Sequence, residues 1–130
     1  MNDPSFPCPC CGYFMFEEPP NSYDICEICF WEDDALQLEF ATTLDGGANT
    51  MTLVEAQRAF AGVGAKAVSR AAHVRKPNGD DRRDPQWRPI GPTDRFPDWN
   101  DAHAKRARAA DETLYYWRPT YWLLDRQLTG

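Results

Sequence analysis

The clearest hydrophobic pattern of the chain lies in residues 50–72, where apolar side chains recur at helical spacing. They stand three, four and three positions apart, on one face of a helix: Leu53, Ala56, Phe60 and Val63. Thr52 followed by Glu55 has the spacing of a capping box, so Thr52 is the predicted N-cap. Gly62 or Gly64 is the predicted end, because glycine commonly closes helices, and an Ala-rich continuation through the region stays open.

A second helical pattern occupies residues 98–130, which are rich in Ala and Trp. Apolar side chains there alternate four and three positions apart: Ala110, Leu114, Trp117, Tyr121, Leu124 and Leu128. Pro119 lies inside this pattern. It should kink or break the helix near Trp117, because proline lacks an amide hydrogen and restricts the residue before it.

Residues 73–97 separate the two helical patterns and are dense in Pro, Gly, Asp and Arg. A stretch of this length without a period is either a linker or an irregular segment fixed by its own apolar side chains. Linkers rarely carry large aromatic side chains, so we expect the segment to be pinned to the core. The expected anchors are Trp87, Ile90, Phe96 and Trp99.

Residues 1–49 show no helical period and are typical of short strands around turns. Two short apolar pieces, at 13–16 and 29–31, flank the turn-rich stretch EEPPNSYD. This pattern predicts two strands joined by a loop. Aromatic residues make up 13% of the chain, enough to build a core, so the sequence is that of a folded protein.

The charge of the chain is unevenly divided. Residues 1–64 carry eleven acidic side chains and one basic one, whereas residues 65–130 carry nine and thirteen, so the two halves have net charges of −10 and +4. There is no apolar segment typical of a signal peptide and no apolar run of the roughly 20 residues that a bilayer span needs. We therefore expect a soluble cytoplasmic protein without a membrane partner. In a reducing cytosol, closely paired cysteines are more often metal ligands than disulfides.

All five cysteines lie in the acidic half. Cys8 with Cys11 and Cys26 with Cys29 form two Cys-x-x-Cys pairs, separated by fourteen residues. Two such turns bring four thiolates around one tetrahedral ion, which suits zinc. Gly12 follows the first pair and supplies the positive φ that closes the turn. Two disulfides, or free thiols in the core, are the alternatives.

These elements together predict an α+β fold. A small zinc-ribbon-like unit with two cysteine turns and short strands would pack with C-terminal helices, within a single domain. Its predicted parts are the zinc-ribbon-like unit 1–49, the helix 50–72, the irregular segment 73–97 and the helical tail 98–130.

Cys10 is left over by this pairing. One hypothesis places it at the exposed tip of the first turn as a reactive thiol, its pKa lowered by the nearby metal. The other makes it a small residue that tolerates the turn and contacts Phe30 or Trp31. Thiols without a neighbouring base usually do no chemistry, which favours the second hypothesis. His73 and His103 are not needed as ligands.

Three stretches of the sequence, FPCPCCGY, EEPPNSYDICEICFWEDD and LDGGANTMTLVEAQRAFAGVGA, resemble the cysteine-rich CPCC family of small bacterial proteins. The resemblance covers roughly residues 5–76 and implies a zinc-binding domain without an assigned reaction. The family's acidic run falls on residues 31–34 and its glycine turn on residues 45–49. Its cysteines fall on Cys8, Cys10, Cys11, Cys26 and Cys29.

For function, we expect a non-enzymatic module that binds a basic protein partner, since an acidic surface attracts and steers such a partner. A bacterial immunity protein or antitoxin that neutralises a nucleic-acid-acting toxin would have this charge. The expected partner-binding residues are Glu32, Asp33, Asp34 and Asp45.

Two other functions are ranked lower. A nucleic-acid- or ribosome-associated zinc ribbon would use Lys and Arg to displace counterions, but the cysteine-bearing half has a single arginine. A basic arm at residues 75–88 could bind RNA, or could instead lie against the acidic half. An enzyme using the WEDD and DGGAN loops comes last, because four thiolates leave no open metal position and DGGAN is more typical of a turn.

Overall fold

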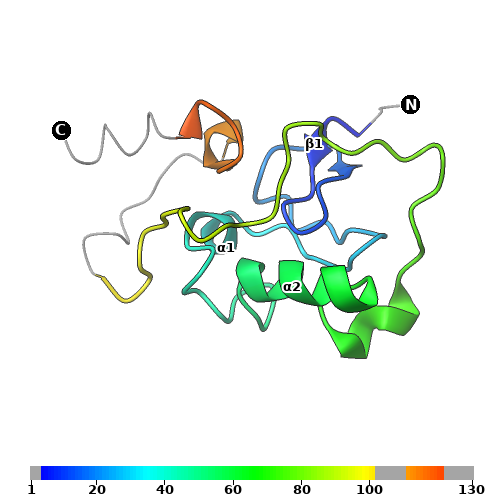
Figure 1. The fold of residues 1–130 in the computed structure, drawn as a ribbon, viewed down its shortest axis with the longest axis horizontal. Helices are drawn as coiled ribbons and strands as arrows, with labels where there is room; N and C mark the ends of the chain where they lie inside the picture. Colours follow the sequence, from blue (N-terminus) through cyan, green and yellow to red (C-terminus); the bar gives the residue numbers. More distant parts are fainter. Residues whose placement is uncertain (1–3, 102–110, 122–130) are drawn as a thin grey trace.

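The computed structural model describes residues 4–101 and 111–121 (Figure 1). Its elements are few and short, and much of the chain consists of turns and loops. In chain order they are β1 (Phe6–Pro7), β2 (Phe14–Phe16), α1 (Ala35–Glu39), α2 (Leu53–Val63) and the 3-10 helices η1 (Val68–His73) and η2 (Glu112–Leu114). The two-stranded antiparallel sheet, the helices and the cysteine cluster near the N-terminus confirm the predicted α+β class with a small zinc-ribbon-like unit.

The two strands of the sheet flank the first cysteine turn in the chain. β1 and β2 pair antiparallel, with Phe6 opposite Phe16. A bridge between Tyr13 and Arg83 brings a distant segment to the other side of β2. The strand predicted at 13–16 is therefore present as β2. The strand predicted at 29–31 is wrong, because the chain turns there with Phe30 at a φ of 72°.

Helix α1 was not predicted. Asp34 is its N-cap and accepts a hydrogen bond from the Leu36 amide at 3.0 Å. The helix has five residues, which is too short to show a hydrophobic period. It positions Gln37, whose buried amide group bonds to the backbone of the following loop.

Helix α2 begins at the predicted N-cap and ends at Gly64, one of the two predicted ends, so the helix predicted over 50–72 is too long. The Thr52 amide donates to the Glu55 carboxylate at 2.9 Å and the Glu55 amide to the Thr52 hydroxyl at 3.2 Å, which completes the capping box. Gly64 ends the helix in the left-handed region, with a φ of 79°. Because Gly64 stops it, the Ala-rich continuation is not α-helical, and η1 follows instead.

The irregular segment after η1 crosses the whole length of the molecule (Figure 1). Trp87, Ile90 and Phe96 pack against the core, and Trp99 makes an edge contact with Phe40 at 5.1 Å between ring centroids. The prediction that aromatic side chains pin this segment is confirmed.

The described part of the C-terminal tail, residues 111–121, contains no α-helix that runs through the predicted pattern. Glu112–Leu114 form η2 and the chain then turns. Four consecutive side chains, 114–117, are buried, which a helix with one apolar face would not allow. The predicted positions Ala110, Leu124 and Leu128 lie outside the described residues.

The core is built around the cysteines. Their buried side chains cluster with large apolar groups from all parts of the described chain. Among these are Phe16, Trp31, Leu38, Leu53, Leu114 and Trp117. Within the described ranges, none of the helices has the length and hydropathy required to cross a bilayer.

Candidate metal centre

The two cysteine pairs meet in the interior. The chain around β1 and β2 supplies Cys8 and Cys11, and the loop before α1 supplies Cys26 and Cys29. All four sulfur atoms lie within 4.8 Å of one another, and all four residues are at most 1% exposed. The described residues contain no other group of three or more His, Cys, Asp or Glu side chains that converges in this way.

The sulfur positions fit a tetrahedral metal ion. The Sγ atoms of Cys8 and Cys29 are 3.5 Å apart, and those of Cys11 and Cys26 are 3.7 Å apart. Four sulfurs placed about 2.3 Å from a central zinc ion would be separated by about 3.8 Å. A disulfide needs about 2.05 Å, and none of the five cysteines forms one, so the disulfide alternative is wrong for this structure.

The two cysteine turns have the same backbone hydrogen bonds. The Cys8 carbonyl accepts from the Gly12 amide at 2.7 Å, and the Cys26 carbonyl accepts from the Phe30 amide at 2.8 Å. The amide of each first cysteine donates to the residue five positions later, at 2.8 and 2.9 Å. Gly12 and Phe30 both have positive φ, 83° and 72°. Each turn therefore directs its two sulfurs to the same point by the same backbone path.

Remote segments hold the outer side of both turns. The Arg83 Nε donates to the Cys11 carbonyl at 2.8 Å, and the Lys66 amide donates to the Cys29 carbonyl at 2.7 Å. The Trp87 indole donates to the Pro9 carbonyl at 3.0 Å. The Pro9 carbonyl also accepts from the Gln57 side-chain amide at 2.9 Å. These bonds supply partners to carbonyl groups of both turns.

The match to known families agrees with this geometry. The model of the cysteine-rich CPCC family matches residues 6–81, more than half of the chain. The chain belongs to this family. The predicted resemblance is confirmed over nearly the same range. A comparison with curated proteins finds no match.

In this member of the CPCC family, the protein environment sets the thiol pKa values in opposite directions. Burial raises the pKa of the Cys8 and Cys29 thiols, and also that of Cys11. Hydrogen bonds from the neighbouring thiols, that of Cys11 first, lower the pKa of Cys26. A cation among the sulfurs would favour the thiolate at every position, because the thiolate is the metal ligand.

Cys10, the family's fifth cysteine, is fully buried, so the hypothesis of an exposed reactive thiol at the tip of the turn is corrected. The side chain lies within the core cluster. After burial, a side-chain hydrogen bond with Cys10 is the next contribution to the raised pKa of Cys29. Cys10 therefore packs beside the ligand set without belonging to the four converging sulfurs.

The predicted partner-binding acids are divided by the structure. Asp33 is buried and accepts from the Ser22 hydroxyl at 2.7 Å, and burial raises the pKa of its carboxyl. Asp34 is buried as the cap of α1 and also accepts from the Ala48 amide at 3.1 Å. Neither can meet a partner, because each supports a local turn. Glu32 is half-buried and Asp45 is exposed.

The DGGAN loop, residues 45–49, is a turn whose last residue is buried in the interior. Asn49 is buried, and its side-chain nitrogen, Nδ2, donates to the Glu32 carbonyl at 2.8 Å and to the Gln37 side-chain oxygen at 2.9 Å. The Lys66 ammonium donates to the Asn49 side-chain oxygen at 2.8 Å. Sequence analysis missed this network, since no period or spacing marks a buried amide.

The basic arm lies against the molecule itself. The Arg75 guanidinium pairs with Asp81 at 2.7 Å and with Glu27 at 3.1 Å. Arg83 stands over the Trp87 ring at 4.6 Å in addition to its bond to the first cysteine turn. Of the two hypotheses for residues 75–88, packing on the acidic half is the one that these contacts support.

Proposed function

We propose that the four cysteine thiolates bind one zinc ion and that this ion is structural. The observation that carries the proposal is the complete burial of four converging sulfurs with tetrahedral spacing. Zinc is the ion for which four thiolates at this spacing are the usual structural ligand set. The thiols must stay reduced to bind it, which fits a reducing compartment such as the cytoplasm.

A closed set of four thiolates argues against catalysis at the metal. Catalytic zinc keeps one position for water or substrate, and here all four positions are taken by protein sulfur. The WEDD and DGGAN loops offer little for a separate active site, because Asp33, Asp34 and Asn49 already accept or donate bonds within the protein.

We further propose that the folded unit binds a basic protein, as an immunity protein or antitoxin would. The supporting feature is the acidic surface formed by the carboxylates that, unlike the buried Asp33 and Asp34, are exposed. Its exposed members within the described residues 4–64 are Glu17, Glu18, Asp24, Glu27, Asp45 and Glu55. Such a surface attracts a cationic protein over long range and repels a phosphate backbone.

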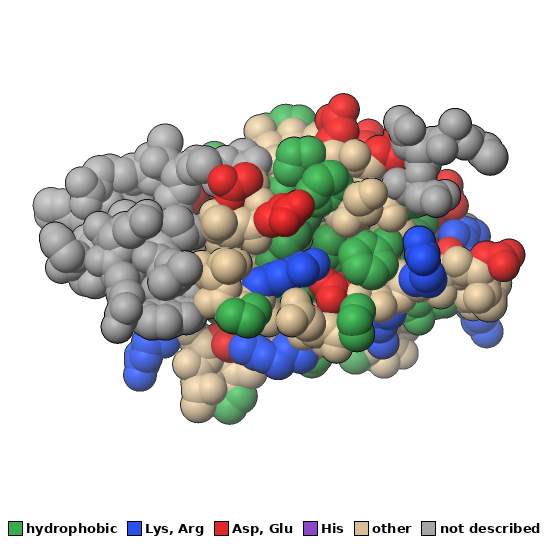
Figure 2. Space-filling view, turned by 90° about the horizontal axis from the view of Figure 1, so that it is seen from above, with side chains coloured by type: hydrophobic (Ala, Val, Ile, Leu, Met, Phe, Trp, Pro, Cys, Tyr) green, Lys and Arg blue, Asp and Glu red, His purple; other side chains and the backbone are tan. Residues whose placement is uncertain are grey.

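The exposed surface is mixed on the face seen in Figure 2, where acidic and basic side chains both lie around apolar ones. Three arginines of the basic arm and its neighbourhood have carboxylate or aromatic partners within the molecule. They are Arg75, Arg83 and Arg88. Their engagement supports a protein partner over a nucleic acid, since counterion release needs cations that can reach phosphate.

Elemental analysis of protein purified without added metal tests the first part of the proposal. We expect about one zinc ion per chain. A folded, fully reduced protein that contains no metal would contradict it.

A pull-down at low and high salt, followed by binding measurements with the purified captured protein, tests the second part. We expect a basic protein whose association slows as salt rises, because exposed charges act mainly on the association rate. Tight binding to mixed RNA or DNA at physiological salt, without a protein partner, would contradict the protein-binding proposal.

A further inference from the structure

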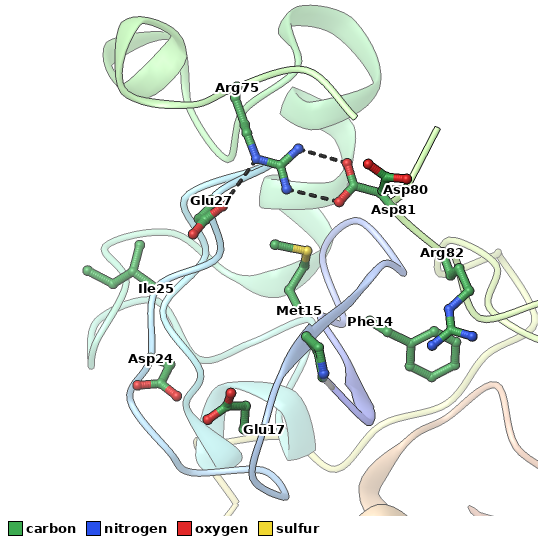
Figure 3. Close-up of a pocket in the computed structure, with 11 residues that line it drawn as sticks. Phe14, Met15, Glu17, Asp24, Ile25, Glu27, Arg75, Asp80, Asp81 and Arg82 are labelled. Carbon is green, nitrogen blue, oxygen red and sulfur yellow. Dashed lines mark hydrogen bonds and ion pairs between the residues drawn. The ribbon is translucent and has the colours of Figure 1, made fainter. Parts of the chain in front are cut away.

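A groove lies between β2, the loop at 24–27 and the arm at 75–82. It encloses about 540 Å³. Its apolar lining comes from Phe14, Met15 and Ile25, and Ile25 is 48% exposed. Figure 3 shows Met15 in the middle of this hollow. Polar groups make up most of the exposed lining, and these three side chains add a smaller apolar patch among them.

Carboxylates stand at both ends of the apolar lining. Glu17 and Asp24 lie at one end, and Asp80 lies with Asp81 at the other (Figure 3). The whole lining includes five carboxylates and two guanidinium groups. The groove is therefore distinctly anionic around an apolar middle.

One of the two guanidinium groups is already neutralised. Arg75 makes two bonds to Asp81, at 2.7 and 2.9 Å, and one to Glu27 at 3.1 Å. This triad forms a fixed wall of the groove. The carboxylates of Glu17, Asp24 and Asp80 have no ion-pair partner among the described residues.

We propose that this groove is the docking site for a short segment of the basic partner, with an apolar side chain flanked by Lys or Arg. This inference rests on the proposed protein-binding function and gives it a location. The apolar side chain contacts Met15 and Ile25, while the flanking cations meet the carboxylates at the two ends. Charge complementarity selects this occupant, since a nucleic acid or an acidic peptide would be repelled.

Fluorescence anisotropy with defined peptides tests the proposal. The probe is fluorescein-labelled Lys-Leu-Lys-Leu-Lys, and it is compared with one peptide in which serine replaces leucine and another in which glutamate replaces lysine. We expect the first peptide to bind best, because it alone supplies both cations and apolar side chains. Equal binding of the serine peptide would overturn the role of the apolar lining.

Variants with matched controls locate the binding. The double variant Glu17→Lys with Asp24→Lys should weaken binding of the probe about ten-fold or more. Asp45 is an exposed acid outside the groove, so the control variant Asp45→Lys should change the affinity for the probe less than about two-fold. Ile25→Ser should weaken it as well, whereas Val68→Ser, at an exposed apolar position elsewhere, should not. Unchanged zinc content and melting temperature show that each variant remains folded.

The outcomes separate the groove from the general function. If Asp45→Lys weakens binding as much as the groove variants, the groove proposal fails while an acidic partner surface stands. If neither the probe nor any basic protein binds, both proposals fail.

Discussion

The two cysteine turns have the same backbone path but are supported by different kinds of donor. In the first turn, most of these donors are side chains from far along the chain, those of Arg83, Trp87 and Gln57. One backbone amide, that of Asp84, joins them at the Gly12 carbonyl. In the second turn the donors are backbone amides, those of Lys66 to Cys29 and Arg75 to Glu27. The first turn is therefore held mainly by particular side chains, whereas the second is held by the path of the backbone beside it.

The residues that close the two turns, Gly12 and Phe30, also differ in how they fit their surroundings. Gly12 has no room for a side chain, because an added Cβ would lie 2.5 Å from a Trp87 ring atom. Phe30 adopts a similar φ with a large side chain, which stands beneath the Arg70 guanidinium at 4.9 Å and the Lys66 ammonium at 5.4 Å. Positive φ is unfavourable for phenylalanine, so tertiary contacts must offset that cost.

The largest effect should come from removing a ligand from either turn. Cys8→Ser and Cys26→Ser should each lose the bound zinc and unfold the N-terminal unit, since the binding free energy of a structural zinc site is folding free energy. Elemental analysis and near-UV circular dichroism check both variants. If one variant kept a full zinc ion and a native spectrum, the two turns would not be equivalent as ligand sources.

Substitutions of Gly12 and Phe30, the residues that close the two turns, should give the next largest difference in stability. Gly12→Ala should destabilise the protein by about 2–4 kcal/mol, because it adds both an unfavourable φ and a clash with Trp87. Phe30→Gly should change stability by less than about 1 kcal/mol, because relief of the backbone offsets the lost cation–π contacts. Thermal unfolding of the zinc-bound proteins measures both changes.

A double variant sharpens this test. If the clash dominates at Gly12, adding Trp87→Leu to Gly12→Ala should recover part of the lost stability. Full additivity of the two losses would mean that φ alone decides the cost.

Substitutions of Arg83 and Arg75, which bond to the first and the second turn, should give a smaller difference in stability. Arg83→Met removes the donor to the Cys11 carbonyl and should cost about 1–2 kcal/mol, the penalty of an unsatisfied buried acceptor. Arg75→Met keeps its backbone bond to Glu27 and loses only partly exposed ion pairs, so about 0.5 kcal/mol is expected. The rate of zinc transfer to a chelator should rise more for Arg83→Met. Equal rates would show that side-chain donors do not control the first turn.

Cys10 should give the smallest effect. Cys10→Ala should keep one zinc ion per chain and lose about 1 kcal/mol, because a small buried group beside the ligands is removed while all four ligands remain. Zinc analysis and the melting temperature check this expectation. Loss of zinc would mean that the four ligands were wrongly assigned.

Local signals in the sequence predicted much of the site. The spacing of Cys8, Cys11, Cys26 and Cys29 predicted the cluster, and Thr52 predicted the start of α2. Gly64, the observed end of α2, was one of the two ends that the sequence offered. Each signal acts within a few residues, where bond geometry limits the chain to a few conformations. The same reasoning failed for residues 29–31, because apolar character alone does not distinguish a strand from a buried turn.

The inward orientation of Asp33 and Asp34 was also beyond sequence reasoning. An acidic run predicts a solvated surface, but here two carboxylates accept hydrogen bonds from Ser22, Leu36 and Ala48. Whether a carboxylate faces water or a backbone amide depends on which loop lies beside it, and the sequence around it does not specify that neighbour.

By itself the sequence determined which four thiols can share an ion, where α2 starts, and that the aromatic side chains of the irregular segment should be anchored. Only the tertiary structure decided how the two turns are held, since their donors Arg83 and Trp87 stand 72 and 78 positions from the carbonyls that they reach. Contacts across such separations depend on the packing of the whole core, because no local preference brings those segments together.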